Sequence, residues 1–139
     1  MMYKSLLVAV DYSEVTERVL GAARELALLS DGEIWLLHLR EREIIPQAGM
    51  VERESHDEAQ LAVDGAVAEL ASAGITTHGE IRNTVFGYAA SEIIDEARKH
   101  DVGVIIMGCR GRGDMAGLLL GSTAHKVIQL TDRPVLVVR

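Results

Sequence analysis

Apolar residues gather in five short runs along the chain, and the segments between these runs carry apolar residues at helical spacing. Four runs are almost continuously apolar, which is typical of strands that are covered on both faces. They are residues 6–10, 34–39, 102–107 and 135–138. The remaining run, residues 75–81, alternates apolar with polar residues, so we expect a half-exposed strand near a sheet edge.

The segments between the strands predict four helices, because their apolar residues recur every three or four positions. We expect these helices over residues 15–29, 55–74, 88–99 and from about 122 onward. Ser13 is the expected N-cap of the first helix. Ser55 and Glu58 have the spacing of a capping box at the start of the second helix.

A polar link from Arg40 to Arg53 joins the second strand to the second helix. It contains Pro46 and Gly49, so we predict a loop. Loops of this length are often functional.

Strand and helix alternate from one end of the chain to the other. This pattern predicts an α/β fold, a five-stranded parallel sheet with helices on both faces and right-handed crossovers. In such sheets ligands bind beyond the carboxyl ends of the strands. Asp11 follows the first strand, and Met107 and Gly108 end the fourth. If these two strands are neighbours, Asp11 and Gly108 face the same crevice.

A glycine-rich loop joins the fourth strand to the last helix. Glycine lets the backbone approach an anion closely, and the N–H groups at a helix start suit a phosphate. The residues that define this loop are Gly108, Gly111, Gly121, Ser122 and Thr123. Arg110 or Arg112 could neutralise a distal phosphate. We therefore interpret the loop as a phosphate-binding site.

The length, charge and cysteine content of the chain limit the kinds of protein that it can be. Its 139 residues predict one domain over residues 1–139, and the net charge of −7 argues against nucleic-acid binding. No apolar run has the length of a membrane span, and the start does not resemble a signal peptide, so no membrane partner is expected. The single cysteine, Cys109, fits a reducing compartment. Together these features predict a cytoplasmic protein.

Other phosphate-handling motifs do not fit. A P-loop requires Lys and Ser or Thr where this chain has Asp114 and Met115. The match of residues 111–116 to a dinucleotide fingerprint follows the fourth strand, whereas the fingerprint belongs in the first turn between strand and helix. A phosphoacceptor receiver domain has a second acid beside Asp11, and none is present.

Side chains for catalysis or metal binding show no recognisable spacing. The five histidines lack a metal-binding pattern, which argues against a metal site made by protein side chains. No catalytic residue is predicted, because neither a Ser-His-Asp order nor a paired carboxylate is present. Asp11 fits two roles, contact with a ligand or capping of the first helix.

The spacing Gly108-x2-Gly111-x9-Gly121-Ser122, after an apolar strand, resembles the ATP-binding motif of the universal stress protein family. The first strand and turn, the second strand at 36–39 and the final strand also resemble that family, in the same order. The resemblance implies a Rossmann-like fold with strand order 3-2-1-4-5. It also implies a homodimer through the terminal strand, Val135 to Val138.

The family resemblance further implies ATP in the crevice, with Mg²⁺ or Mn²⁺ held mainly by the phosphates. The residues that would surround adenine and ribose are Ala9, Val10, Asp11, Leu39, Met107 and Gly108. Leu39 would offer backbone hydrogen bonds to the base. Gly111, Gly121, Ser122 and Thr123 would hold the phosphates. The turn at residues 84–87 lacks the proline of many family members, so no binding role is expected there.

The leading interpretation is a regulatory stress-response protein whose conformation or partner choice depends on ATP. Two alternatives remain at this point. One is a slow ATPase or phosphotransferase that uses Asp11 or Ser122. The other is an interaction module that binds no nucleotide and acts through its terminal strand.

Overall fold

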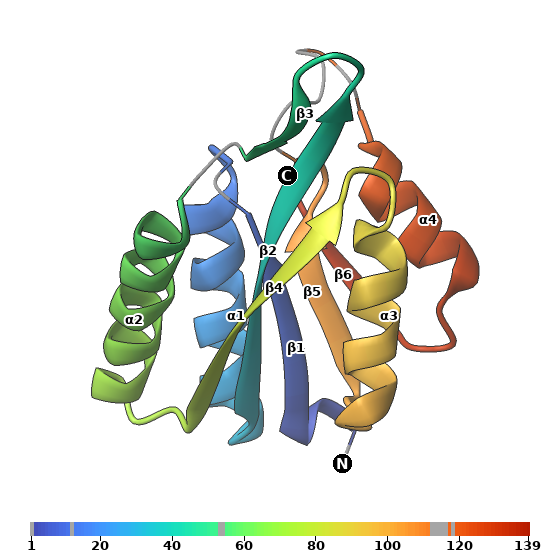
Figure 1. Cartoon of the computed structure of the whole chain (residues 1–139). Coiled ribbons are helices and arrows are strands. Elements are labelled where there is room, and N and C mark those ends of the chain that lie inside the picture. Colours follow the sequence, from blue (N-terminus) through green and yellow to red (C-terminus); the bar gives the residue numbers. More distant parts are fainter. Residues whose placement is uncertain (1, 12, 53–54, 112–116, 118) are drawn as a thin grey trace.

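Five parallel strands form the centre of the protein (Figure 1). A computed structural model describes residues 2–11, 13–52, 55–111, 117 and 119–139. The parallel strands, in chain order, are β1 (Ser5–Val10), β2 (Glu33–Ile45), β4 (Thr77–Val85), β5 (Val104–Gly108) and β6 (Val135–Val138). Their order across the sheet is β4-β2-β1-β5-β6, which confirms the expected order 3-2-1-4-5.

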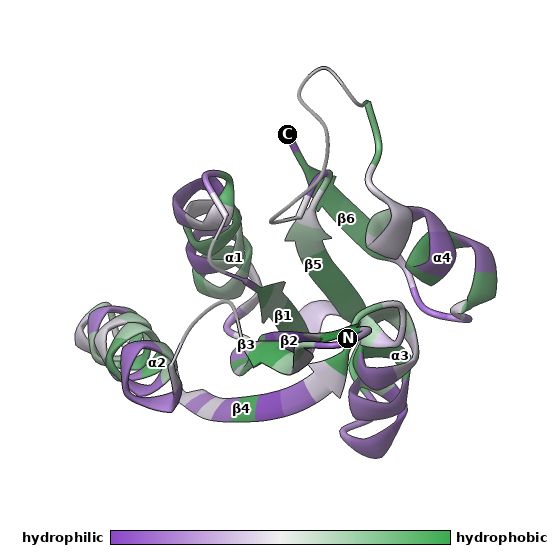
Figure 2. Cartoon of the chain, turned by 45° about the horizontal axis from the view of Figure 1, so that its top comes forward, coloured by the Kyte–Doolittle hydropathy of each residue, from purple (hydrophilic) through white to green (hydrophobic). Residues whose placement is uncertain are grey.

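Helices cover both faces of this sheet, as predicted (Figure 2). Helices α1 (Thr16–Ser30) and α2 (His56–Ser72) pack on one face, and α3 (Ala89–Lys99) and α4 (Ser122–Leu130) on the other. A 3-10 turn, η1 (Met2–Lys4), precedes β1. No helix among the described residues is long and apolar enough to cross a membrane.

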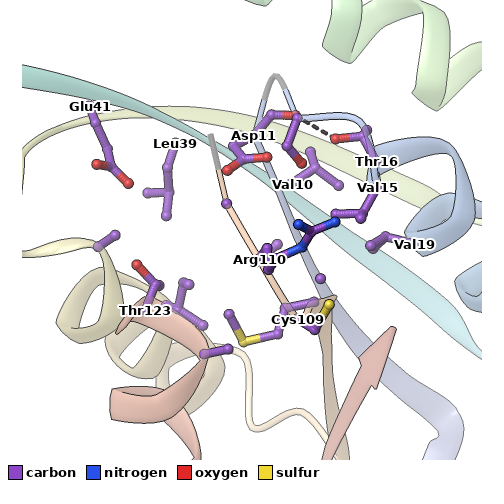
Figure 3. A pocket seen from close by; sticks show the side chains of 18 of the residues that line it. Val10, Asp11, Val15, Thr16, Val19, Leu39, Glu41, Cys109, Arg110 and Thr123 are labelled. Carbon is purple, nitrogen blue, oxygen red and sulfur yellow. Dashed lines mark hydrogen bonds between the residues drawn. The ribbon is translucent and has the colours of Figure 1, made fainter. Parts of the chain in front are cut away.

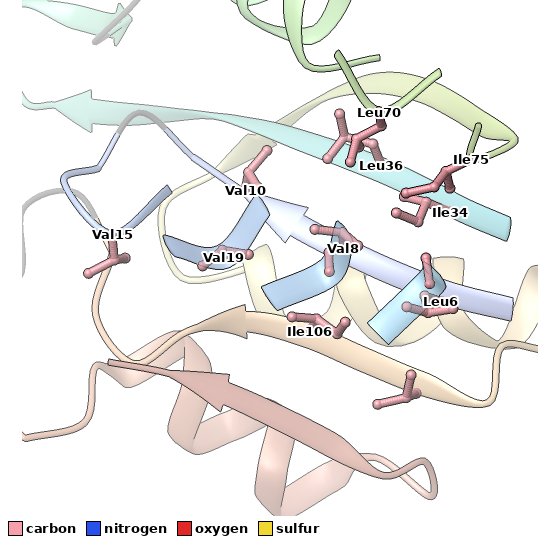
Figure 4. Close-up of a cluster of buried hydrophobic side chains, with 13 residues drawn as sticks. Leu6, Val8, Val10, Val15, Val19, Ile34, Leu36, Leu70, Ile75 and Ile106 are labelled. Carbon is pink, nitrogen blue, oxygen red and sulfur yellow. The ribbon is translucent and has the colours of Figure 1, made fainter. Parts of the chain in front are cut away.

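Each face of the sheet has its own apolar core, because successive side chains of a strand point to opposite faces. Leu6 and Val8 of β1 face α1 and α2, and Figure 4 shows them packed with Val19 and Ile106. Leu7 faces α3 and α4. Burial of β1 on both faces explains its continuous apolar sequence.

Residues 40–53 were predicted as a loop, and this is wrong for most of the segment. β2 continues to Ile45, and an added strand, β3 (Gly49–Glu52), pairs antiparallel with its end. Arg42 pairs with both β3 and β4, so these strands lie on opposite edges of β2. β3 therefore lies on the β1 side, beyond the carboxyl end of β1. This hairpin has no helix over it, so its polar sequence resembles that of a loop.

The two predicted N-caps have different outcomes. The Ser55 hydroxyl accepts a hydrogen bond from the Glu58 N–H at 3.1 Å, which confirms the capping interaction. Ser13 does not cap α1, because that helix begins at Thr16 with no side-chain cap. The Thr16 hydroxyl instead donates to the Asp11 carbonyl at 2.6 Å and holds the turn that follows β1.

The strand predicted to be half exposed is β4, which lies at the edge of the sheet as expected. Gly79 lets this strand approach α2 closely. A Cβ at Gly79 would lie 2.7 Å from a methyl group of Val63 and 2.8 Å from one of Val67. The absence of a side chain at Gly79 therefore lets β4 pack directly against α2.

Candidate functional site

A crevice opens where β1, β2 and β5 end, at the edge of the sheet where parallel α/β folds bind ligands (Figure 3). It joins Asp11, after β1, to the loop after β5, as the sequence predicted. Nine of the eleven predicted site residues line it: Ala9, Val10, Asp11, Leu39, Met107, Gly108, Gly111, Ser122 and Thr123. The space enclosed by the lining residues is about 60 Å³, so most of the crevice is open.

The first turn of α4 forms one end of the crevice. Gly121 is the N-cap, and its carbonyl accepts a hydrogen bond from the His125 N–H at 3.0 Å. The N–H groups of Ser122, Thr123 and Ala124 belong to the first turn, where a helix offers no carbonyl partner. With the positive end of the helix dipole, they make this end of the crevice suited to an anion.

Gly121 is not among the residues that line the crevice, whereas Ser122 and Thr123 are. Its N–H donates to the Cys109 carbonyl at 2.6 Å, which ties the start of α4 to the end of β5. The amide donors that remain for a ligand are those of the residues after it. Arg112 lies outside the described residues.

Gly108 is required for close packing between β5 and the residues before α1. A Cβ at this position would lie 2.5 Å from Cγ2 of Val15 and 3.2 Å from the Arg110 carbonyl oxygen. The absence of a side chain therefore lets the end of β5 lie against the turn that carries Asp11. This contact brings the two halves of the predicted site together.

The Asp11 side chain lies at the opposite side of the crevice from Thr123 (Figure 3). A second hollow, of about 430 Å³, lies between α1 and α2 and shares Val10, Asp11, Ser13 and Thr16 with the crevice. The buried His38 lines that second hollow. Of the two, only the crevice includes the glycine loop and the start of α4, so it is the better candidate for phosphate binding.

Arg110 lines the crevice and forms an ion pair with Glu14, with 3.0 Å between Nη2 and Oε1. The Glu14 side chain is 79% exposed. Exposed ion pairs contribute little to stability. Arg110 can therefore exchange Glu14 for an anionic ligand at small cost.

Glu41 and Phe86 line the crevice, although neither was predicted as a site residue. Glu41 was assigned to a loop, whereas β2 carries it two residues beyond Leu39 on the same face. Phe86 belongs to the turn for which no binding role was expected. Its N–H donates to the Arg42 carbonyl at 2.8 Å, which holds the turn beside β2. Residues 40–43 are all charged, so no apolar alternation in the sequence marked Glu41 as part of a strand.

Comparison with known proteins gives a consistent result across the chain. The sequence model of the universal stress protein family matches residues 2–139. Universal stress protein MJ0577 of Methanocaldococcus jannaschii is 30% identical, with 100% of this chain and 96% of that protein covered. Universal stress protein YxiE of Bacillus subtilis is 28% identical, with 99% of this chain and 100% of that protein covered.

Solved structures show the same fold. The structure of MJ0577 superposes with a TM-score of 0.82 at 28% identity, with 99% of this chain and 96% of that chain covered. A universal stress protein from Archaeoglobus fulgidus, solved in complex with dAMP, gives a TM-score of 0.69 at 28% identity, and both chains are covered completely.

Proposed function

Because this chain belongs to the universal stress protein family, we propose that it binds ATP in the crevice and acts as a nucleotide-dependent regulatory protein in the stress response. The observation that carries the proposal is the position of the α4 N-terminus opposite Asp11 in one crevice. The dAMP complex of the related Archaeoglobus fulgidus protein supports an adenine nucleotide as the ligand class.

In this proposal the base lies beside Leu39 and Asp11, and the ribose lies near Met107 and Gly108. Leu39 provides backbone hydrogen bonds to the base. Because the enclosed space is small, the nucleotide also occupies the open part of the crevice. The carboxylates of Asp11 and Glu41 can accept hydrogen bonds from amino or hydroxyl groups of the nucleotide.

The phosphates point toward the first turn of α4, where amide N–H groups and the helix dipole stabilise negative charge. Gly111, Ser122 and Thr123 approach them, while Gly121 positions this turn through its bond to Cys109. The phosphates and the serine and threonine hydroxyls are oxygen ligands of the type that Mg²⁺ and Mn²⁺ prefer. The divalent ion is held mainly by the phosphates.

The chain also forms a homodimer through β6 in this proposal. All four residues of β6 are apolar, yet none is fully buried within one chain. An exposed apolar edge strand is an aggregation hazard unless another strand covers it. Pairing with β6 of a second copy removes that hazard.

The change Ser122→Glu tests the phosphate assignment. Ser122 is exposed at the first position of α4, so a carboxylate there leaves the fold intact and adds a favourable helix-dipole interaction of about 0.3–1 kcal/mol. The same carboxylate repels a triphosphate, since like charges about 4 Å apart near a protein surface repel by a few kcal/mol. We expect ATP affinity to fall about tenfold or more, measured by isothermal titration calorimetry.

The matched control is Ala68→Glu, which adds the same charge on an exposed position of α2, away from the crevice. It should leave ATP affinity unchanged. Equal affinity of the unaltered chain, Ser122→Glu and Ala68→Glu would count against phosphate binding at α4. Mass analysis of the purified protein for retained ATP or AMP tests separately whether any nucleotide binds.

A further inference from the structure

A second cluster of polar side chains lies between β4 and α3, separate from the crevice. Glu80 of β4 pairs in register with Leu37, whose side chain belongs to the core beneath α3. Glu96 and His100 extend from the last turns of α3 on the same side of the sheet. They line a hollow of about 280 Å³ that shares no described residue with the crevice.

Three side chains in this hollow present ligand atoms to one point. One ligand atom from each of Glu80, Glu96 and His100 lies within 4.8 Å of the other two. Oε2 of Glu96 and Nε2 of His100 are 3.1 Å apart, and the two residues are four positions apart on one helix. Two ligands of a tetrahedral ion lie about 3.4 Å apart when each is about 2.1 Å from it, so a small movement brings this pair to that spacing. The separation of this pair therefore suits a shared ion.

Arg82 contacts the carboxylates of both Glu80 and Glu96. Its Nη2 binds Oε1 of Glu96 and lies 3.4 Å from Oε1 of Glu80, and its Nη1 donates to Glu92 at 2.7 Å. Oε2 of Glu96 stays turned toward His100. Arg82 thus occupies the position of an outer partner that orients ligand carboxylates.

Negative charge exceeds positive charge around the hollow. Glu80, Glu92 and Glu96 contact Arg82, and Glu33 contacts His78. Lys99 is a second permanent cation among the described residues here, 3.7 Å from Glu96. In these ion pairs of the described residues, four carboxylates therefore face two permanent cations, and the imidazoles of His78 and His100 carry no charge when deprotonated. A divalent cation would balance this excess of negative charge.

The Glu96 side chain is only 2% exposed, and Arg82, Lys99 and His100 all contact its carboxylate group. A buried carboxylate needs polar or charged partners of this kind, and these contacts fix the position of its two oxygens.

We propose that Glu80, Glu96 and His100 form a binding site for a divalent transition-metal ion of the Zn²⁺ type. One imidazole nitrogen with two carboxylates is a donor set that suits Zn²⁺, whereas Mg²⁺ and Ca²⁺ prefer oxygen alone. Three protein ligands leave a fourth position for water. The spacing of histidines in the sequence does not reveal this site, because it contains a single histidine and its third ligand, Glu80, comes from β4 and not from α3. The proposal does not depend on nucleotide binding in the crevice.

Trp35 provides a direct reporter of metal binding. It is the single tryptophan of the chain, and it stacks on His100, with 3.7 Å between ring centroids and 11° between planes. His78 stacks on Trp35 as well, with centroids 4.1 Å apart, but is not one of the three ligands. An ion on His100 therefore changes the fluorescence of Trp35.

The experiment titrates Zn²⁺ into untagged, metal-free and nucleotide-free protein, followed by calorimetry and by Trp35 fluorescence. We expect one ion per chain with a matching fluorescence change. His100→Gln should weaken binding about tenfold or more. His78→Gln removes a histidine from the same stack but no ligand, so its affinity should match that of the unaltered chain.

Glu80→Gln provides a second test at a ligand whose side chain is 42% exposed, where a substitution does not disturb the core. It should also weaken Zn²⁺ binding. The proposal is overturned if the unaltered chain shows no saturable one-to-one binding in the micromolar range. Equal affinity of His78→Gln, Glu80→Gln and the unaltered chain overturns it too, because the ion then binds elsewhere.

Discussion

At the scale of single residues, the sequence predicted most of the crevice, because residues that end parallel strands meet at one edge of a sheet. Asp11 and Gly108 lie in different parts of the chain and line the same crevice. The sequence motif did not reveal why position 108 is glycine. The reason is contact with Val15, which depends on how α1 packs against β5.

Gly108→Ala should destabilise the protein by about 1–3 kcal/mol, because the added Cβ overlaps Val15 and the core must shift. Equilibrium unfolding in urea measures this loss. In a Val15→Ala background the same substitution should cost less, since the clashing methyl group is absent. Equal costs in the two backgrounds would contradict the packing argument.

Gly21→Ala is the matched control for this substitution. Gly21 lies in α1 with open space around the added Cβ. Alanine is the better helix former, so we expect a gain of about 0.5–1 kcal/mol in the free energy of unfolding. A loss of similar size at both glycines would indicate that the assay reports glycine replacement in general.

At the scale of elements, the sequence predicted the alternation of strands and helices because buried strands and amphipathic helices have different apolar periods. It did not predict β3 or the full length of β2, because Ile44 and Met50 lie on a hairpin that no helix covers. Their side chains are 65% and 51% exposed. The hairpin is not buried, so its sequence lacks the apolar pattern by which buried strands are recognised.

The two serines before α1 and α2 provide a prediction at this scale. Ser55→Ala should cost about 1 kcal/mol, because it removes the hydrogen bond to the Glu58 N–H at the start of α2. Ser13→Ala should be neutral or slightly stabilising, since the buried Ser13 hydroxyl has no hydrogen-bond partner in the described part of the chain. Urea unfolding of both variants checks the difference, and a larger loss at Ser13 would contradict the assignment of the caps.

At the scale of the whole molecule, β6 is the apolar edge of the sheet and β4 the polar one. The Pro134 carbonyl accepts a hydrogen bond from the Ile105 N–H of β5, and the Val138 carbonyl accepts one from the N–H of Cys109, directly after β5. In a parallel ladder, alternate residues of a strand direct their backbone N–H and C=O groups toward the same neighbour. Val135 and Val137 therefore direct these groups away from β5. Those groups are available to pair with a second copy of β6.

Val137→Pro should convert the proposed dimer into a monomer, because it removes an outward N–H while the hydrogen bonds to β5 remain. Analytical ultracentrifugation measures the change. Thr77→Pro places the same residue at the start of β4, the opposite edge, and should leave the oligomeric state unchanged. A dimer that survives Val137→Pro would contradict assembly through β6.

The central claim is that the start of α4 and the turn after β1 form the two ends of one ATP site. A crystal structure of the chain grown with Mg-ATP tests it most directly. We predict electron density for the triphosphate at the amides of Ser122 and Thr123, with the adenine beside Leu39. A crevice that holds only solvent, or ATP bound elsewhere on the molecule, would contradict the claim.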